Sequence, residues 1–165
     1  MWILLLASGL STSLLAFEPV TPDYVYSFPR DHFAHPEFRT EWWYYTGNVV
    51  SIEGQRFGFE LTFFRMTVEE EPADGESWAI RDLYLAHLAL SDIDGHRFHR
   101  TERLNRSGPG LAGADFGQGR IWNGNWQVLW AAPKDPLGRQ HLRATSDDFA
   151  LDLEIKPRKP AVIHG

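Results

Sequence analysis

The sequence predicts an all-β fold, an antiparallel barrel or sandwich of about eight short strands. Apolar side chains recur at every second residue in several stretches, as they do in half-buried strands. Turn sequences rich in Gly and Asp separate these stretches, and no stretch has a convincing helical period. The length of 165 residues, with 43% hydrophobic and 23% charged residues, is that of one globular domain.

Residues 1–16 form an apolar leader that carries no charged side chain and ends in small residues. It resembles the apolar core and cleavage region of a secretory signal, with cleavage after Ala16. No Lys or Arg precedes it, so a weak anchor is one alternative, and a buried N-terminal helix, disfavoured because the segment shows no amphipathic period, is another. We therefore expect a secreted or periplasmic protein, with peripheral membrane association as a variant, whose folded domain spans residues 17–165. The chain has no cysteine, so its core must hold without disulfides.

The first hairpin follows an extended, proline-rich lead-in over residues 17–41. Its first arm is WWYYTGNVVSI, its turn is the glycine-containing stretch 52–55, and its second arm is RFGFELTFFR. In the second arm Phe59, Leu61 and Phe63 alternate with polar or small residues. This alternation places the three side chains on one face of a strand.

Further strands are expected over residues 82–92 and, after the turn at Asp94-Gly95, over HRFHRTERL. WNGNWQVLWA and the two arms around TSDD continue the same pattern towards residue 155. Two stretches break it, the acidic run 68–78 and the Gly-rich run 105–120, and both are expected to be loops.

The charge distribution excludes several partners. The formal net charge is −6, and the sequence contains no cluster of Lys and Arg. Because the phosphates of a nucleic acid require such a cluster, we expect no nucleic-acid partner. The acidic run lacks the ligand spacing of a known calcium loop. The Gly-rich run lacks the Lys and the following helix of a phosphate loop, so no cofactor is predicted.

A polar cluster precedes the aromatic run, and it contains Asp31, His35 and Glu41. A carboxylate beside four aromatic residues must be paired, with Arg39 or Arg65, or be protonated with a raised pKa, which would make it a proton donor. His35 could act as a general base whose tautomer Asp31 fixes. His-x-x-His with a glutamate is a weak zinc pattern outside a helix, so no metal is predicted.

The aromatic run itself is the predicted wall of a ligand site. In a strand Trp43 and Tyr45 share one face with Glu41, and the other two rings share the opposite face. Packing in the core is the alternative for all of them. His87, in the next strand but one, is either a satisfied core residue or a second polar group of the site. The predicted ligand-binding residues are Trp42, Trp43, Tyr44, Tyr45, Phe59 and Tyr84.

Three stretches, FPRDHFAHPEFRTEWWYYTGNV, RFGFELTFFR and LYLAHLALSD, give the chain a family resemblance. It resembles the N-terminal half of the AttH-like family, which includes carotenoid 1,2-hydratases (hydroxyneurosporene synthases) and predicted secreted hydrolases. The resemblance implies two successive lipocalin-like barrels, of which this chain would be the first. A second lipocalin-like domain is therefore expected as a partner, and this sequence does not contain it.

Two functions follow. The first is a cofactor-independent hydratase that adds water to a C=C bond of an isoprenoid or lipid. In that scheme Glu41 or Asp31 is the acid, His35 or His87 directs the water, and the aromatic wall stabilises the cation. The second is a non-catalytic periplasmic carrier of an apolar small molecule. A hydrolase ranks below both, because no G-x-S-x-G motif occurs.

Overall fold

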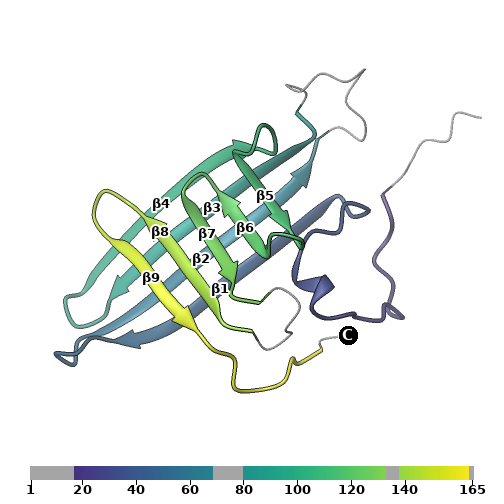
Figure 1. The fold of residues 1–165 in the computed structure, drawn as a ribbon. Helices are drawn as coiled ribbons and strands as arrows, with labels where there is room; N and C mark the ends of the chain where they lie inside the picture. The colour runs from purple at the N-terminus through teal and green to yellow at the C-terminus, as the bar shows by residue number, and fades with distance from the viewer. Residues whose placement is uncertain (1–16, 69–79, 133–137, 164–165) are drawn as a thin grey trace, which may run out of the picture.

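The computed structural model describes residues 17–68, 80–132 and 138–163, which form nine strands and one short 3-10 helix. The leader at 1–16 and most of the acidic run at 68–78 lie outside the described residues. The strands form two antiparallel sheets in which each strand pairs with the next along the chain (Figure 1). The prediction of an all-β antiparallel fold is confirmed.

The first sheet has the order β1-β2-β3-β4 and contains the long strands. They are β1 (Thr40–Val50), β2 (Arg56–Thr67), β3 (Asp82–Asp92) and β4 (Arg97–Arg106). The register pairs Trp43 with Phe63 and Tyr45 with Leu61, so apolar residues meet on the inward face. These strands match the two predicted hairpins, because alternation and turn residues favour the same register.

The second sheet has the order β5-β6-β7-β8-β9 and contains shorter strands. They are β5 (Ala112–Asp115), β6 (Arg120–Asn123), β7 (Trp126–Trp130), β8 (Gln140–Thr145) and β9 (Ala150–Ile155). The expectation that residues 105–120 form only a loop is wrong, because β5 lies within them. A Cβ atom on Gly113 would lie 2.5 Å from the ring of Trp122, so this glycine allows close packing rather than flexibility.

The core lies between the two sheets, and both contribute fully buried side chains to it. The inward residues of β7, Trp126, Val128 and Trp130, pack against the inward residues of β2 and β3. Alternate residues of the strands other than β4 supply this layer, as expected for two sheets packed face to face. The buried core consists of Phe33, Leu61, Phe63, Ala86, Leu88, Ile121, Trp126, Val128, Trp130, Leu142, Ala144 and Leu151.

The two sheets remain distinct, with β1 at one edge of the first and β9 at one edge of the second. The second sheet has more strands than the first, but they are shorter, and it covers part of the inward face of the first (Figure 1). The fold therefore has lipocalin-like antiparallel sheets, with nine strands instead of about eight, but no hydrogen-bonded ladder closes them into a barrel among the described residues. The lead-in, residues 17–39 with the helix η1 (Arg30–His32), lies at the end where β1 begins (Figure 1).

Candidate functional site

A largely buried ion-pair network, which we call the latch, joins the lead-in to the first sheet. Its members are Asp31, His35, Glu41, Arg65 and Asp82. His35 Nδ1 lies 2.6 Å from Glu41 Oε1, and His35 Nε2 lies 3.2 Å from Asp31 Oδ1. Both ring nitrogens therefore face a carboxylate, and both can donate a hydrogen bond only in the imidazolium form.

Arg65 is the centre of the latch, with only 2% of its side chain exposed. Its Nε donates to Glu41 Oε2 at 3.0 Å and its Nη1 donates to Asp82 Oδ1 at 3.2 Å. Its Nη2 donates to the backbone carbonyls of His35, at 2.9 Å, and Phe38, at 2.5 Å. The strand register explains the pairing, because Glu41 lies directly opposite Arg65. Of the two partners predicted for Glu41, the structure selects Arg65.

Glu41 accepts hydrogen bonds at both oxygens. Besides the contacts with Arg65 and the His35 ring, its Oε2 accepts a hydrogen bond from the backbone N–H of His35 at 2.8 Å. Each of these donors stabilises the ionised carboxylate. Of the two alternatives for Glu41, an ion-paired carboxylate or a proton donor, the geometry provides the ion pair.

Asp31 is held in the same way at the other end of the latch. Burial alone would raise the pKa of this carboxyl group, but hydrogen bonds from the Ser27 backbone N–H and from His35 outweigh burial and lower the pKa. The Ser27 nitrogen lies 2.6 Å from Asp31 Oδ2, and the Tyr24 hydroxyl donates to the same oxygen at 3.2 Å. Asp31 thus ties the exposed part of the lead-in to His35.

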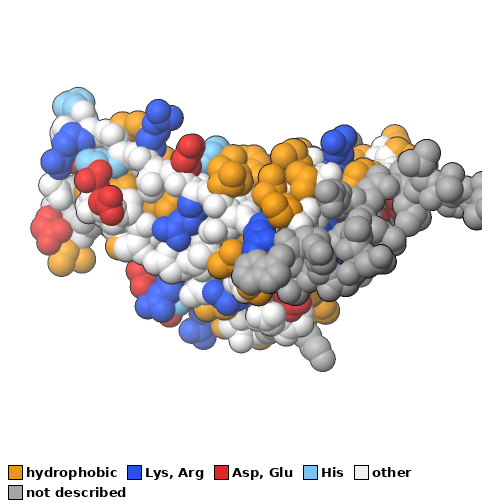
Figure 2. Space-filling model, turned by 90° about the horizontal axis from the view of Figure 1, so that it is seen from above, with side chains coloured by type: hydrophobic (Ala, Val, Ile, Leu, Met, Phe, Trp, Pro, Cys, Tyr) orange, Lys and Arg blue, Asp and Glu red, His pale blue; other side chains and the backbone are white. Residues whose placement is uncertain are grey.

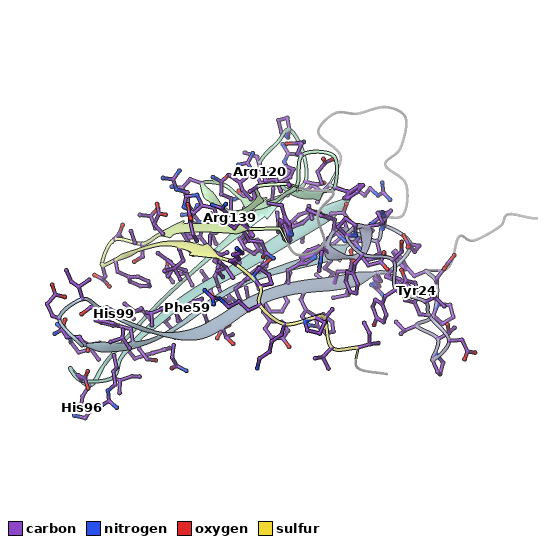
Figure 3. The ribbon with its side chains drawn as sticks, turned by 60° about the horizontal axis from the view of Figure 1, so that its bottom comes forward. Tyr24, Phe59, His96, His99, Arg120 and Arg139 are labelled. Carbon is purple, nitrogen blue, oxygen red and sulfur yellow. The ribbon has the colours of Figure 1, made fainter. Side chains whose placement is uncertain are left out.

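The inward aromatic residues fill the space between the sheets. Trp43, Tyr45 and Phe59 pack against the core cluster, and Tyr84 is buried beside Arg65 in the register. Burial raises the pKa of both Tyr45 and Tyr84, so both phenols stay neutral at physiological pH. Glu41 and the partner of Phe59, Gly47, are six residues apart on β1, roughly 20 Å along the strand. Figure 3 likewise shows Tyr24 and Phe59 well apart along the molecule.

The outward face of the first sheet holds the remaining predicted residues. Trp42 and Tyr44 are exposed there. His87 lies on the same face, and the strand register aligns it with Tyr44 through Thr62. One row across the four strands is wholly apolar, and the next is mostly polar. The apolar row is Trp42, Phe64, Leu85 and Leu104, and the polar row is Tyr44, Thr62, His87 and Glu102.

A groove of about 550 Å³, which we call the outer groove, opens beside the polar row. His87 Nε2 lies 3.8 Å from Glu102 Oε2 in its wall. A second hollow of about 340 Å³ shares Glu60, Ala89 and Phe98 with it and extends it along the sheet. The lining residues are Glu60, His87, Leu88, Ala89, Phe98, Arg100, Thr101 and Glu102.

The structure therefore divides the predicted site in two. Asp31, His35 and Glu41 come together in the latch, whereas His87 lies across the sheet from them and near the outer groove. Trp42 and Tyr44 belong to the outward set, and Trp43, Tyr45, Phe59 and Tyr84 belong to the inward one. The hypothesis that His87 acts together with Glu41 has no geometric support in this arrangement.

Within residues 17–68, 80–132 and 138–163, no group of three His, Cys, Asp or Glu side chains is arranged to hold a metal ion. In those ranges no helix has the length and apolar character needed to cross a membrane. The face seen in Figure 2 mixes acidic and basic side chains and has no continuous basic stripe.

The comparison with protein families decides the relationship of this chain. The model of the AttH-like family matches residues 19–165. The chain belongs to the AttH-like family. No curated protein matches it.

A solved structure extends this AttH-like assignment to three dimensions. The 2.00 Å crystal structure of a candidate AttH protein from Nitrosomonas europaea is similar to this chain, with 28% sequence identity and a TM-score of 0.74. The similarity covers 90% of this chain but 43% of that one. The AttH-like domain described here thus spans less than half the length of that relative.

Sequence reasoning missed several residues of this AttH-like domain. It missed Asp82 of the latch and Thr67, whose hydroxyl supports the latch at 2.6 Å from Asp82 Oδ1. They lie opposite one another at the ends of β2 and β3, a pairing that only the register reveals. The outer groove was missed because its residues Glu60, Phe98 and Glu102 look like ordinary solvent-facing positions of alternating strands.

Proposed function

We propose that this AttH-like domain binds an apolar small molecule, an isoprenoid or a lipid, in the outer groove and along the adjoining apolar row. One observation carries the proposal: an apolar row of the first sheet, exposed at Trp42 and Leu104, lies next to the polar row that borders a groove of about 550 Å³. Trp42 is 58% exposed and Leu104 is 62% exposed, and both lie in this row. Exposed apolar patches of this kind mark interaction or ligand sites in soluble domains.

The chemistry of the groove defines the ligand further. A hydrocarbon chain suits the row that contains Trp42, Phe64 and Leu104, because its burial there removes apolar surface from water. His87 and Glu102 offer hydrogen bonds at the neighbouring row, so a hydroxyl group near one end of the chain suits the groove. The groove volume lies within the range of about 300–1,000 Å³ that is typical of small-molecule sites.

A fluorescence titration with retinol, a hydroxylated polyene, tests this binding. Replacing Trp42 and Leu104 by Thr keeps β-forming residues and removes half-exposed apolar side chains. If half of the value of full burial, about 1 kcal/mol, is lost at each position, the dissociation constant rises by about 30-fold. Ile52→Thr removes a fully exposed apolar residue on the β1–β2 turn and is the matched control. Equal affinity in the double variant and the control would refute binding at this face.

Hydration of a C=C bond is the second candidate function. It is favoured by the closeness of His87 and Glu102 in a groove that adjoins aromatic side chains. Glu60 or Glu102 would donate the proton to the alkene carbon and His87 would direct water to the other carbon. Mass spectrometry after incubation with a polyene would detect the gain of one water, and His87→Ala would abolish it. Recovery of only unaltered polyene leaves the domain as a non-catalytic carrier.

The placement of the domain in a larger system is part of the same proposal. A second lipocalin-like domain is a candidate partner, since this chain spans 43% of its Nitrosomonas europaea relative. Export to the periplasm or beyond, with peripheral membrane association, fits an apolar ligand and the apolar leader at residues 1–16. Fractionation of cells that express the full sequence would locate the mature protein.

A further inference from the structure

Phe33 differs from every other residue of the lead-in. It is 1% exposed, and it is the only residue within 17–39 that is buried. Its ring lies 4.8 Å from the ring of Trp130 and 5.5 Å from that of Phe116. A side chain from an irregular segment therefore completes the core at the end where β1 begins.

The segment that carries Phe33 forms no ladder with either sheet. It is joined to β2 by one backbone hydrogen bond, from the Thr67 N–H to the Arg39 carbonyl, and by the latch. The remaining backbone hydrogen bonds that this segment makes with described residues run within the segment itself. Residues 18–27 of the segment are exposed. The sheets keep their own backbone hydrogen bonds when this segment opens, so its opening would break the latch and expose Phe33 without separating the strands.

The Phe33 side chain occupies a place in the core that we call its seat, and Trp130 borders this seat. The indole nitrogen of Trp130 is unusual. The Trp130 side chain is buried, with 6% exposure, yet its indole Nε1 has no hydrogen-bond acceptor among the described residues. Buried donors normally have a partner, and one that lacks it carries a desolvation cost. An oxygen of a bound molecule at this place would accept that hydrogen bond.

We propose that the seat of Phe33 is a second apolar site, which the chain occupies with its own side chain until a ligand displaces it. The ligand is an apolar molecule with a ring and an oxygen acceptor: the ring takes the place of the Phe33 side chain, and the oxygen accepts the hydrogen bond of Trp130 Nε1. This inference goes beyond the outer groove, because it concerns the opposite face of the first sheet and different residues.

The latch sets how readily the seat opens. His35 is two residues from Phe33 and is fixed between Asp31 and Glu41. While these contacts hold, Phe33 stays in place and competes with the ligand. A ligand binds only the molecules in which the site is open, so its apparent affinity falls as the open fraction falls. Weakening the contacts that hold the Phe33 side chain in the site therefore strengthens ligand binding.

The first test uses Prodan, a neutral naphthalene ketone whose fluorescence rises in apolar surroundings. All proteins are full chains that carry Trp42→Thr and Leu104→Thr, so that the outer groove contributes little. Adding Phe33→Ala should lower the dissociation constant of Prodan by about tenfold or more, because the probe no longer displaces a ring. Adding Phe33→Leu, which refills the seat, is the matched control and should leave the affinity near that of the parent. Equal affinities of the folded Ala and Leu variants overturn the proposal.

The second test needs no change at Phe33 and decides the matter if the Ala variant does not fold. Amide hydrogen exchange of residues 31–39 is measured with and without saturating Prodan in the protein with Phe33 intact. Displacement of the plug predicts faster exchange in this segment when the probe is bound. Unchanged or slower exchange overturns the proposal. Neither readout depends on binding at the outer groove, so failure of the proposed function leaves this test unaffected.

Discussion

Arg65→Met removes the only guanidinium of the latch while it retains much of the side-chain volume. Glu41 and Asp82 would then be largely buried carboxylates without their cation, and the carbonyls of His35 and Phe38 would lose a donor. Every one of these contacts is made by a side chain that is 2% exposed, so water cannot replace it without a rearrangement of the lead-in. The change should therefore destabilise the whole domain.

The size of the loss follows from the unpaired groups. Removing one partner of a buried ion pair costs about 3–5 kcal/mol, because the other charge stays buried. A carbonyl left without its donor costs about 1–3 kcal/mol, but these terms overlap when the lead-in relaxes. We expect a decrease of about 4 kcal/mol in the free energy of unfolding. For a domain of about 150 residues this corresponds to a fall in Tm of roughly 10 °C or more.

Urea unfolding followed by tryptophan fluorescence measures this difference. Arg56→Met is the matched control, since Arg56 forms an ion pair with Asp94 in which both side chains are exposed. Such surface pairs contribute little to stability, so the control should unfold close to the original protein. If Arg65→Met is as stable as Arg56→Met, the latch is not the anchor of the lead-in and the reasoning is wrong.

Three further predictions concern the latch and the second sheet. The pKa of Asp31 is lower in the folded protein than the unfolded value of about 3.8. The contribution of Asp31 to stability is therefore present above the unfolded pKa and is lost as the pH falls through the folded pKa. In Asp31→Asn the free energy of unfolding should fall less steeply than in the original protein as the pH is lowered below about 4. Gly113→Ala should destabilise the domain by about 1–3 kcal/mol in urea, since the new methyl group overlaps Trp122, whereas Gly58→Ala meets only ordinary contacts and should cost less. Glu41→Gln should lower the Tm but leave the retinol dissociation constant unchanged, because Glu41 lies on the opposite face from the outer groove; a weakened affinity would return Glu41 to the binding site.

The strands of the first sheet could be predicted because several local preferences agree. Alternation in RFGFELTFFR, the turn glycine at Gly54 and the Asp94-Gly95 turn all specify the same two hairpins. The glycines of residues 105–120 have low strand propensity, and the sequence therefore predicted a loop. A strand forms there because Gly113 allows the ring of Trp122 to pack closely against it. Strand propensity reports how a side chain fits its neighbours, and those neighbours are fixed only in three dimensions.

The candidate site could be predicted only in part. The polar character of Asp31, His35 and Glu41 indicated a cluster, and the structure brings these three together. These three residues form a closed ion-pair network because Arg65 contacts Glu41 and Asp82 contacts Arg65. Only the strand register places Arg65 and Asp82 there, and the sequence pattern does not give that register. The outer groove depends on how the residues of β2, β3 and β4 are aligned across the sheet, and periodicity assigns residues to faces but does not give this alignment.

The most direct test of the account is an NMR titration of the ¹⁵N-labelled protein with retinol. Binding at the outer groove predicts that backbone amide shifts concentrate in the central part of β2, β3 and β4, around Thr62, His87 and Glu102, with β1 amides near Trp42 also affected. Amides of β7 and β8, which belong to the second sheet on the other side of the first sheet from the outer groove, should change little. Shifts concentrated in β7 and β8, or no shifts at saturating retinol, would contradict the account.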